Sequence, residues 1–383
     1  MWIVAGLAMG PAVALGLARF AYALLLPAMR SDLGWSYAAA GAMNTANAAG
    51  YLCGALLAAP AVQRLGVKRT YLTGILLTAA AITACGLTGQ FALLLTLRLA
   101  AGVMGALAFV AGGAITAAAS GSAVRAPLAL GIYFAGGGMG IAMSAVTIPL
   151  LLSAAGWRGG WLALGGLALI ASCIAMPALK RAPLPALPTH RVDAVLWPLR
   201  RIAIELGGYV LFGAGYIAYV TFIIAHLRTA SDFTPAEISL FWATLGIAAV
   251  GGVFAWSPVL ARLKGGLGAA ATISMVTLGA AVPLVADSRA AAYVSAILFG
   301  GSFLSVITAV TSFARRAAPP EAWTRAIAAL TVAFGIGQCV GPLLSGYLSD
   351  GPNGVRLGLE LSAAILVAST FVIALQRELP APR

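Results

Sequence analysis

Residues 3–28 read IVAGLAMGPAVALGLARFAYALLLPA, an apolar run of 26 residues whose one charged side chain is Arg19. About twenty apolar residues are enough for a helix to cross the hydrocarbon core of a membrane. Runs of the same kind follow along the chain, for example at 69–88 and 355–376. They predict a protein built from membrane-spanning helices.

The composition of the whole chain supports this interpretation. Hydrophobic residues make up 61% of the chain and charged residues only 9%, and the mean hydropathy is +0.99. A soluble domain carries about 25% charged residues. A transmembrane barrel would show alternating segments of about ten residues, whereas the apolar runs here are continuous. The expected fold class is all-α and polytopic.

Polar residues divide the apolar runs into twelve expected helices, six on either side of one long polar segment. The first six are 3–28, 37–62, 69–88, 91–119, 127–154 and 159–178, and the second six are 202–227, 236–261, 266–286, 291–314, 322–348 and 355–376. The expected domains are an N-terminal six-helix bundle (1–178), a cytoplasmic linker (179–200) and a C-terminal six-helix bundle (201–383).

The net charge of +13 would suggest nucleic-acid binding in a soluble protein. In a membrane protein, Lys and Arg gather in the cytoplasmic loops. With both termini inside, cytoplasmic segments hold sixteen of these residues and outer loops five, while Arg19 and Arg98 lie within helices. We therefore expect a multi-pass protein of a bacterial inner membrane with both termini in the cytoplasm, in contact with lipid and not with nucleic acid.

The start of the chain lacks the basic region of a signal peptide, because its first basic residue is Arg19. We expect no cleaved leader. The chain begins almost inside its first helix, which suggests a shortened start.

The two halves repeat each other in sequence. Residues 16–22 (GLARFAY) align with 213–219 (GAGYIAY), and 60–65 (PAVQRL) with 258–263 (PVLARL), at offsets of 197 and 198. Several matches in order at nearly one offset are improbable by chance. Two related six-helix halves are typical of secondary transporters with a binding site near the middle of the membrane.

With these features the chain resembles the major facilitator superfamily over nearly its full length. The loop 59–69 (APAVQRLGVKR) resembles the superfamily's loop between helices 2 and 3, with Gln63 in place of its usual acidic residue. The resemblance implies a gating role for Arg64, Gly66, Lys68 and Arg69. It implies structural roles for the motif residues Arg98, Gly102 and Gly105 in helix 4, and Gly341 and Pro342 in helix 11.

Within the superfamily, the segments 16–29 (GLARFAYALLLPAM) and 44–57 (NTANAAGYLCGALL) resemble the YbfB/YjiJ-type branch. That resemblance implies a monomeric carrier of a small molecule but leaves the substrate open. Antiporters of the superfamily often have a Gly-Pro pair in helix 5, which is missing here, so export is the weaker alternative.

Arg19 is the strongest single candidate for the substrate site. It lies at least about 13 Å from either end of its expected helix, too far for its side chain to reach the membrane surface comfortably. An arginine at this depth costs at least about 2.5–3.5 kcal/mol unless it faces a polar cavity. Its guanidinium could bind a carboxylate, sulfonate or phosphate through two hydrogen bonds. The alternative is a structural pair with helix carbonyls.

Other polar residues could line the same cavity. Asn44, Asn47 and Tyr51 share one face of the second expected helix, where hydrogen bonds between helices are the alternative role. Aromatic rings with hydroxyl groups suit a small organic anion. We therefore expect a substrate site made of Arg19, Tyr22, Asn44, Asn47, Tyr51, Tyr216, Tyr219 and Gln338.

Proton coupling would require a buried acid. Glu205 is the candidate, although its place in the first turn of an expected helix favours an interfacial role. Trp242 is expected to lie in the aromatic belt at the membrane surface. Exchange of one anion for another would need no such acid.

A membrane enzyme or a sensor is the competing class of function. The two histidines, His190 and His226, fall on opposite sides of the expected membrane, and no catalytic or metal-binding spacing occurs. The four cysteines lie in apolar runs, and no phosphate-binding loop is present. We therefore expect a transporter that uses an existing gradient, with no cofactor, no metal and no enzymatic activity. It would carry a small organic anion or, alternatively, export an amphiphilic drug or metabolite.

Overall fold

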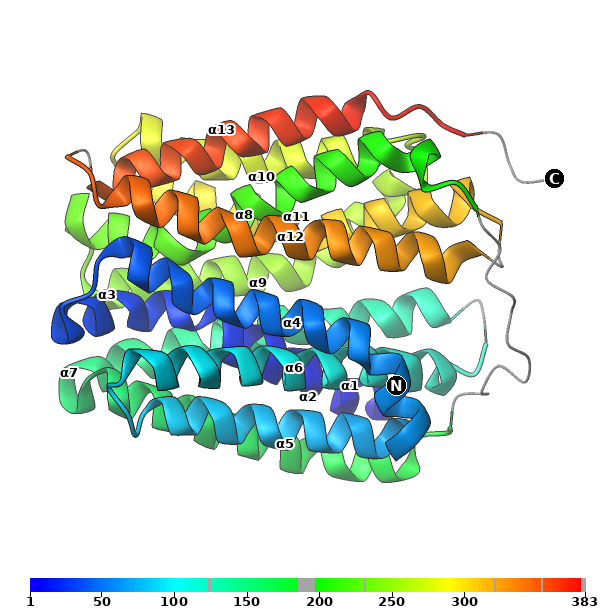
Figure 1. Ribbon diagram of the computed structural model, residues 1–383, viewed down its shortest axis with the longest axis horizontal. Coiled ribbons are helices and arrows are strands. Elements are labelled where there is room, and N and C mark those ends of the chain that lie inside the picture. Colours follow the sequence, from blue (N-terminus) through cyan, green and yellow to red (C-terminus); the bar gives the residue numbers. More distant parts are fainter. Residues whose placement is uncertain (123–124, 185–196, 231, 320–321, 353, 380–383) are drawn as a thin grey trace.

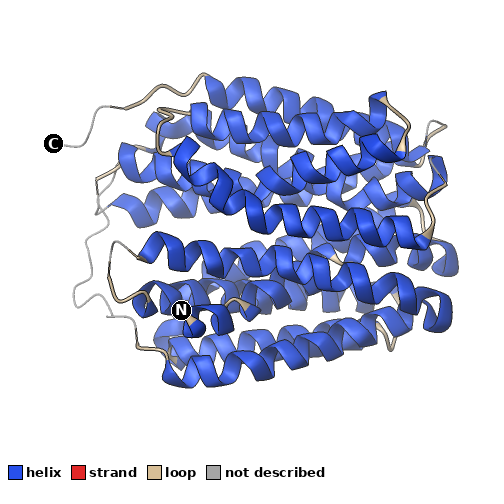
Figure 2. Ribbon diagram, turned by 180° about the vertical axis from the view of Figure 1, so that it is seen from behind, coloured by secondary structure: helices blue, strands red, loops and turns tan. Residues whose placement is uncertain are grey.

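The structure is a computed structural model in which residues 1–122, 125–184, 197–230, 232–319, 322–352 and 354–379 are described. These residues form helices joined by short loops, and no strand occurs among them (Figure 2). The all-α fold class expected from the sequence is confirmed.

The N-terminal half contains α1 (Trp2–Leu7), α2 (Met9–Pro11), a π-helical segment η1 (Ala12–Phe20), α3 (Tyr22–Leu33), α4 (Tyr37–Leu65), α5 (Val67–Cys85), α6 (Phe91–Ala119) and α7 (Ala126–Arg181). The C-terminal half contains a short 3-10 turn η2 (Leu199–Ile202), α8 (Ala203–Ala230), α9 (Pro235–Leu260), α10 (Leu267–Val285), α11 (Arg289–Ala317), α12 (Trp323–Ser349) and α13 (Gly354–Ala374). The expected linker falls mostly outside the described residues.

Ten stretches of helix are long and apolar enough to cross a membrane. One of them, α7, is two antiparallel helices that meet at Gly156, whose φ of 61° breaks the helix. With α5, which packs between α6 and α7, the described residues make twelve long helical passes. The expected separation of the third and fourth helices near Gly89 is also found, because α5 ends at Cys85 and α6 begins at Phe91.

The first pass differs from the single helix expected over 3–28. Pro11 has no N–H to donate to the carbonyl of Leu7, and the hydroxyl of Tyr71 donates to that carbonyl instead at 2.9 Å. The chain then continues as the π-helix η1, in which Ala21 N–H donates to Gly16 O at 3.0 Å, five residues back. π-Helical turns insert an extra residue into a helix and occur often at functional sites.

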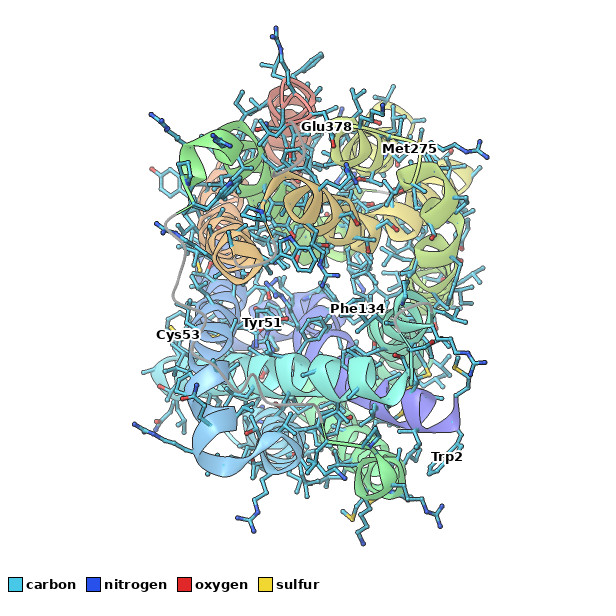
Figure 3. All side chains as sticks on the ribbon, turned by 90° about the vertical axis from the view of Figure 1, so that its right-hand side faces the viewer. Trp2, Tyr51, Cys53, Phe134, Met275 and Glu378 are labelled. Atoms are coloured by element: carbon cyan, nitrogen blue, oxygen red, sulfur yellow. The ribbon has the colours of Figure 1, made fainter. Side chains whose placement is uncertain are left out.

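The N-terminus and the C-terminal end of α13 lie at one end of the bundle, which we call the terminal end, and the loop between α3 and α4 lies at the opposite, distal end (Figure 1). Seen along the bundle from the terminal end, the N-terminal half lies below the C-terminal half (Figure 3). The halves meet along two seams, α4 against α12 and α7 against α9, with α3 also contacting α8.

Glycines allow the helices to approach closely. A Cβ on Gly140 of α7 would lie 2.9 Å from the Cα of Gly16 in η1, and a Cβ on Gly102 of α6 would lie 2.8 Å from the backbone nitrogen of Tyr51. Small residues at helix interfaces are the usual way that membrane helices pack. Gly102 is therefore a point of close contact between α6 and α4.

The α4–α12 seam is closed at the distal end by the carboxylate of Asp350, which follows α12. Its two oxygens accept hydrogen bonds from the N–H groups of Tyr37 at 2.6 Å and Ala38 at 3.0 Å. Ser36 accepts from the next N–H, that of Ala39, at 3.1 Å. These N–H groups have no partners inside their own helix, so a residue of the C-terminal half caps a helix of the N-terminal half. We call this contact the Asp350 cap.

One expectation about the surface is wrong. Trp242 was expected in the aromatic belt, but its side chain is fully buried. The reason is that α9 lies between α7 and α11 and turns this face toward the protein. A tryptophan near a helix end therefore does not by itself mark the membrane surface.

Candidate functional site

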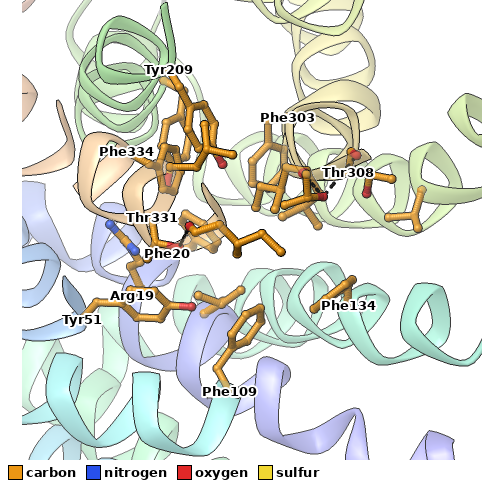
Figure 4. Close-up of a pocket in the computed structure, with 18 residues that line it drawn as sticks. Arg19, Phe20, Tyr51, Phe109, Phe134, Tyr209, Phe303, Thr308, Thr331 and Phe334 are labelled. Atoms are coloured by element: carbon orange, nitrogen blue, oxygen red, sulfur yellow. Dashed lines mark hydrogen bonds between the residues drawn. The ribbon is translucent and has the colours of Figure 1, made fainter. Parts of the chain in front are cut away.

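A cavity of about 150 Å³ lies between the two halves. Its walls extend from the middle of the bundle toward the terminal end, because Tyr209 is near the start of α8 and Thr311 near the end of α11. Eighteen residues line it (Figure 4): Leu15, Arg19, Phe20, Tyr51, Phe109, Phe134, Tyr209, Tyr216, Val253, Phe303, Leu304, Ile307, Thr308, Thr311, Ile327, Leu330, Thr331 and Phe334.

Arg19 is the one charged residue among those described as lining the cavity. Its side chain leaves the π-helix η1 and is 2% exposed. The guanidinium carbon lies 5.5 Å from the ring centre of Tyr51, in a cation–π contact. Its Nε and Nη2 have no hydrogen-bond partner among the described residues. Two adjacent unsatisfied donors on a planar fork match the geometry of a carboxylate.

Aromatic rings form the wall of the cavity contributed by the C-terminal half. Tyr209 stacks on Phe334 with ring centres 4.7 Å apart and planes 12° apart. Tyr216 stacks on Phe334 at 5.4 Å and on Phe303 at 6.1 Å. Across the seam, Phe20 meets Phe303 edge to face at 5.7 Å. Rings from both halves therefore come together over the arginine.

Tyr216 and Gln338 form a pair beside the cavity. The Nε2 group of Gln338 donates to the Tyr216 hydroxyl at 2.5 Å. Gln338 itself is buried behind the wall and does not line the cavity. Because the hydroxyl oxygen accepts from Gln338, its proton remains available to a bound group. Arg19 and Tyr216 occupy matching positions in the two sequence repeats, and both line the cavity.

The other intramembrane arginine, Arg98, is held in the N-terminal half. It is 1% exposed, and its guanidinium donates to the carbonyl of Ala18 in η1, to Met43 O at 3.4 Å and to Asn44 Oδ1 at 3.5 Å. Its charge also lies 4.9 Å from the ring centre of Tyr22. Arg98 thus joins three helical passes and fixes the backbone next to Arg19.

The remaining expected site residues bond to other helices and lie away from the cavity lining. Tyr22 donates to Ala40 O at 2.8 Å, and the hydroxyls of Tyr219 and Ser295 are 2.5 Å apart. The Nδ2 group of Asn47 donates to Arg98 O at 3.1 Å. The Nδ2 group of Asn44 donates to Thr221 Oγ1 across the seam between the halves at 2.5 Å. Of the residues expected from the sequence, the cavity brings together Arg19, Tyr51 and Tyr216.

The residues for which the family resemblance implies a gating role lie at the terminal end. Gly66 joins α4 to α5 with a φ of 82°, which a residue with a Cβ rarely adopts. Lys68 Nζ donates to the carbonyl of Lys180 at 3.0 Å, a contact inside the N-terminal half. Arg64 is exposed.

Glu205 is fully buried in the first turn of α8. Its N–H donates to Gln376 Oε1 at 3.3 Å, but both of its carboxyl oxygens lack a hydrogen-bond partner among the described residues. Tyr209, one turn further along α8, lines the cavity. Glu205 therefore lies between the terminal end of the bundle and the cavity.

Sequence reasoning missed most of the cavity wall. Phe109, Phe134, Phe303 and Phe334 sit in uniformly apolar helices, where spacing does not separate cavity-facing rings from lipid-facing ones. The repeat offers one signal, since Phe134 and Phe334 occupy matching positions at an offset of 200. Within the described residues there is no cluster of His, Cys, Asp or Glu that could hold a metal ion.

Comparison with known families identifies the chain. A sequence model of the family described as "Uncharacterised MFS-type transporter YbfB" matches residues 11–374. The chain belongs to this family of the major facilitator superfamily. The match covers both halves of the bundle, so the resemblance inferred from the sequence motifs is confirmed. This MFS transporter is therefore a multi-pass membrane protein with a small-molecule substrate.

Two characterised relatives are similar in sequence. The human "Monocarboxylate transporter 11" is 27% identical over 280 residues, which are 67% of this MFS transporter and 58% of the human protein. The chain thus spans less than two thirds of that relative. The "Chloramphenicol resistance protein" of Streptomyces lividans is 29% identical over 369 residues, or 94% of this chain and 92% of the relative.

Solved structures of other transporters share the fold. The nucleoside transporter NupG superimposes with a TM-score of 0.75 at 14% identity, covering 98% of each chain. A bacterial homologue of the human lysosomal transporter Spinster, described as inward-facing and unoccupied, gives a TM-score of 0.70 at 14% identity, covering 97% of this chain and 95% of the other. At this identity the similarity establishes the fold alone.

Proposed function

We propose that this MFS transporter carries a small organic anion and that Arg19 binds the negative charge. The observation behind this proposal is the pair of unsatisfied guanidinium nitrogens in a cavity with no other charged lining residue among those described. A buried cation without a partner is costly, and a bound anion would remove that cost. The human relative's name refers to monocarboxylates, which fits a site with one positive charge.

The positions of Lys and Arg favour a cytoplasmic location for the terminal end. Arg64, Lys68, Arg181, Arg201 and Arg262 all lie there. In that orientation the cavity faces the cytoplasm, and the Asp350 cap closes the outer side. Transport would then proceed by alternating access, with the two halves opening in turn around Arg19.

Loss of Arg19 tests the proposal directly. Removing one partner of a buried charge pair costs about 2–5 kcal/mol, so we expect Arg19→Ala to weaken anion binding by about 30-fold or more. Arg19→Lys keeps the charge but loses the two-pronged geometry, and should retain an intermediate affinity. Arg262→Gln, which removes an exposed positive charge, is the matched control.

The measurement is uptake of radiolabelled organic anions into proteoliposomes containing the full chain, together with equilibrium binding in detergent. The expected order of activity is the parent equal to Arg262→Gln, then Arg19→Lys, then Arg19→Ala. Full transport by Arg19→Ala would show that the arginine does not bind the substrate, and the proposal would fail.

We further propose Glu205 as the proton site if transport is coupled to protons. Burial without hydrogen-bond partners destabilises the charged form of a carboxyl group and so favours its protonated, neutral form. Arg316 influences it electrostatically from α11, and Tyr209 separates it from the cavity. Glu205→Gln should abolish accumulation driven by a pH gradient while anion exchange continues. If the variant accumulates substrate like the parent, Glu205 is not the proton site. If neither protein accumulates substrate in response to a pH gradient, exchange without proton coupling is supported instead.

A second candidate function is export of a neutral amphiphilic compound. It is favoured by the Streptomyces relative, whose name refers to chloramphenicol resistance, and by the eight aromatic residues that line the cavity. Expression of this chain in a drug-sensitive bacterium should raise chloramphenicol tolerance if export is its function. If cells expressing Arg19→Ala tolerate chloramphenicol as well as cells expressing the parent, export does not depend on the proposed anion site.

We place the protein in the inner membrane of a bacterium with both termini in the cytoplasm. There it would act as a monomer in contact with lipid, without a cofactor and without catalysing a reaction. Light scattering of the detergent-solubilised protein tests the monomer.

A further inference from the structure

The size of the cavity limits the ligand. A cavity of about 150 Å³ is close to the volume that holds a benzene molecule in an engineered protein core. A ligand with one ring and one small charged group fills such a space. Disaccharides, nucleotides and multi-ring drugs would need the halves to move apart.

The charges limit the ligand further. Arg19 supplies one positive charge, and the described lining residues include no acid and no second cation. A dianion would bring an uncompensated negative charge into an apolar space, which is costly. A cationic ligand would be repelled by Arg19, and no acidic residue among the described lining residues would compensate its charge. The site therefore suits a single negative charge.

Two threonine hydroxyl groups along the wall are already bonded within the protein. Thr311 Oγ1 donates to Ile307 O at 2.7 Å, and Thr331 Oγ1 donates to Ile327 O at 2.9 Å (Figure 4). Both hydroxyl protons are used within their own helices. Sugars and similar ligands need many polar partners, so this wall favours an apolar body.

The rings define the shape of that body. Tyr209, Phe334, Tyr216 and Phe303 are stacked with their planes within 19° of one another in each contacting pair. A flat ring can extend such an array at the usual stacking distance. Tyr216, which stacks on both Phe334 and Phe303, has a hydroxyl proton available for the ligand's anionic group.

From size, charge and ring geometry together, we propose that the substrate is an aromatic monocarboxylate with a single ring and its carboxylate on or one atom from that ring. This inference rests on the proposed anion transport and specifies its substrate class. Arg19 binds the carboxylate through two N–H groups, Tyr216 donates a third hydrogen bond, and the ligand's ring packs against the aromatic array that includes Phe334.

Binding of benzoate to the purified full-length protein tests this inference. Titration calorimetry would compare benzoate with pyruvate (an aliphatic monoanion), phthalate (a dianion) and benzamide (a neutral molecule of the same shape). We expect benzoate to bind at least tenfold more tightly than each of the other three. Arg19→Ala should abolish the preference for benzoate over benzamide.

A variant of the ring wall gives an independent measurement. Phe334→Leu should weaken benzoate binding by about fivefold to tenfold, the range expected for loss of an aromatic contact, with little effect on pyruvate. Phe371→Leu is the matched control, since Phe371 is 70% exposed on the outer surface of α13. Thermal unfolding of each variant verifies that it is folded.

The outcomes separate the two proposals. If pyruvate or phthalate binds as tightly as benzoate and binding needs Arg19, anion transport stands and the aromatic class is wrong. If none of the three anions binds to folded protein, the aromatic class is also wrong. If benzamide binds as well as benzoate, or Arg19→Ala binds benzoate unchanged, the proposed anion site itself fails.

Discussion

The Asp350 cap gives a quantitative prediction about the conformational equilibrium. Asp350→Ala removes the acceptor for the N–H groups of Tyr37 and Ala38, while Ser36 still caps the third N–H. Loss of a helix N-cap costs about 0.5–2 kcal/mol, and loss of a negative charge at a helix N-terminus about 0.3–1 kcal/mol. Because this contact joins the two halves, its loss destabilises the conformation that is closed at the distal end relative to the one that is open there.

The total of about 1–3 kcal/mol corresponds to a shift of roughly fivefold to 150-fold in the ratio of closed to open molecules. Asp350 is exposed, and solvent weakens such charge interactions. We therefore expect a value near the lower end, about fivefold to tenfold. Asp350→Asn keeps one acceptor oxygen and should give a smaller shift.

Electron–electron distance measurements between spin labels at Leu87 and Ala290 would report the change, since these exposed residues lie at the distal ends of the two halves. Asp32→Asn is the control. Asp32 is also a distal carboxylate, but its oxygen accepts from Trp157 Nε1 at 2.7 Å within the N-terminal half. A distance distribution in Asp350→Ala identical to those of the parent and Asp32→Asn would refute the reasoning.

Three further predictions concern stability, each measured as the thermal unfolding midpoint in detergent. Arg98→Leu should lower the midpoint, because each buried carbonyl that loses its charged donor costs about 1–3 kcal/mol. Arg19→Leu should leave the midpoint unchanged or raise it. A lower midpoint for both variants would mean that Arg19 is structural. Gly16→Leu should reduce the free energy of unfolding by about 1–3 kcal/mol or more, since its Cβ would lie 2.8 Å from a backbone nitrogen of α7. Gly207→Leu, where the Cβ would face open space, should leave the free energy of unfolding unchanged. Gly66→Ala should cost about 1–3 kcal/mol because its φ is 82°, and an unchanged midpoint would contradict this.

The sequence predicted the architecture well because hydrophobic length is nearly sufficient to define membrane helices. The spans, the repeat and the family motifs agree with the helices of the structure and with the family match. Arg19 could also be identified, since an isolated charge deep in an apolar helix needs a polar environment. Arg19 does line the central cavity, but the wall of that cavity is mostly apolar and not the polar environment that was expected.

The details of the site could not be predicted in the same way. Which face of a helix points inward depends on its rotation, and helices that are apolar all round carry no such signal. Asn44 and Tyr51 share a face of α4, yet the first bonds across the seam to Thr221 and the second lines the cavity. The π-helix η1 was missed because Pro11 alone does not specify which hydrogen-bond pattern follows it. The Asp350 cap joins residues more than 300 positions apart.

The unpaired guanidinium of Arg19 has an electrical consequence for the transport cycle. With no ligand, the cavity holds a positive charge that must stay hydrated, and closing both ends around it would cost several kcal/mol. In the proposed transport of a monocarboxylate, the occluded site would be neutral when the substrate is bound, so the loaded protein would change sides more easily than the empty one. The return of the empty protein would then limit net flux. Substrate supplied on the opposite side of the membrane would accelerate the cycle.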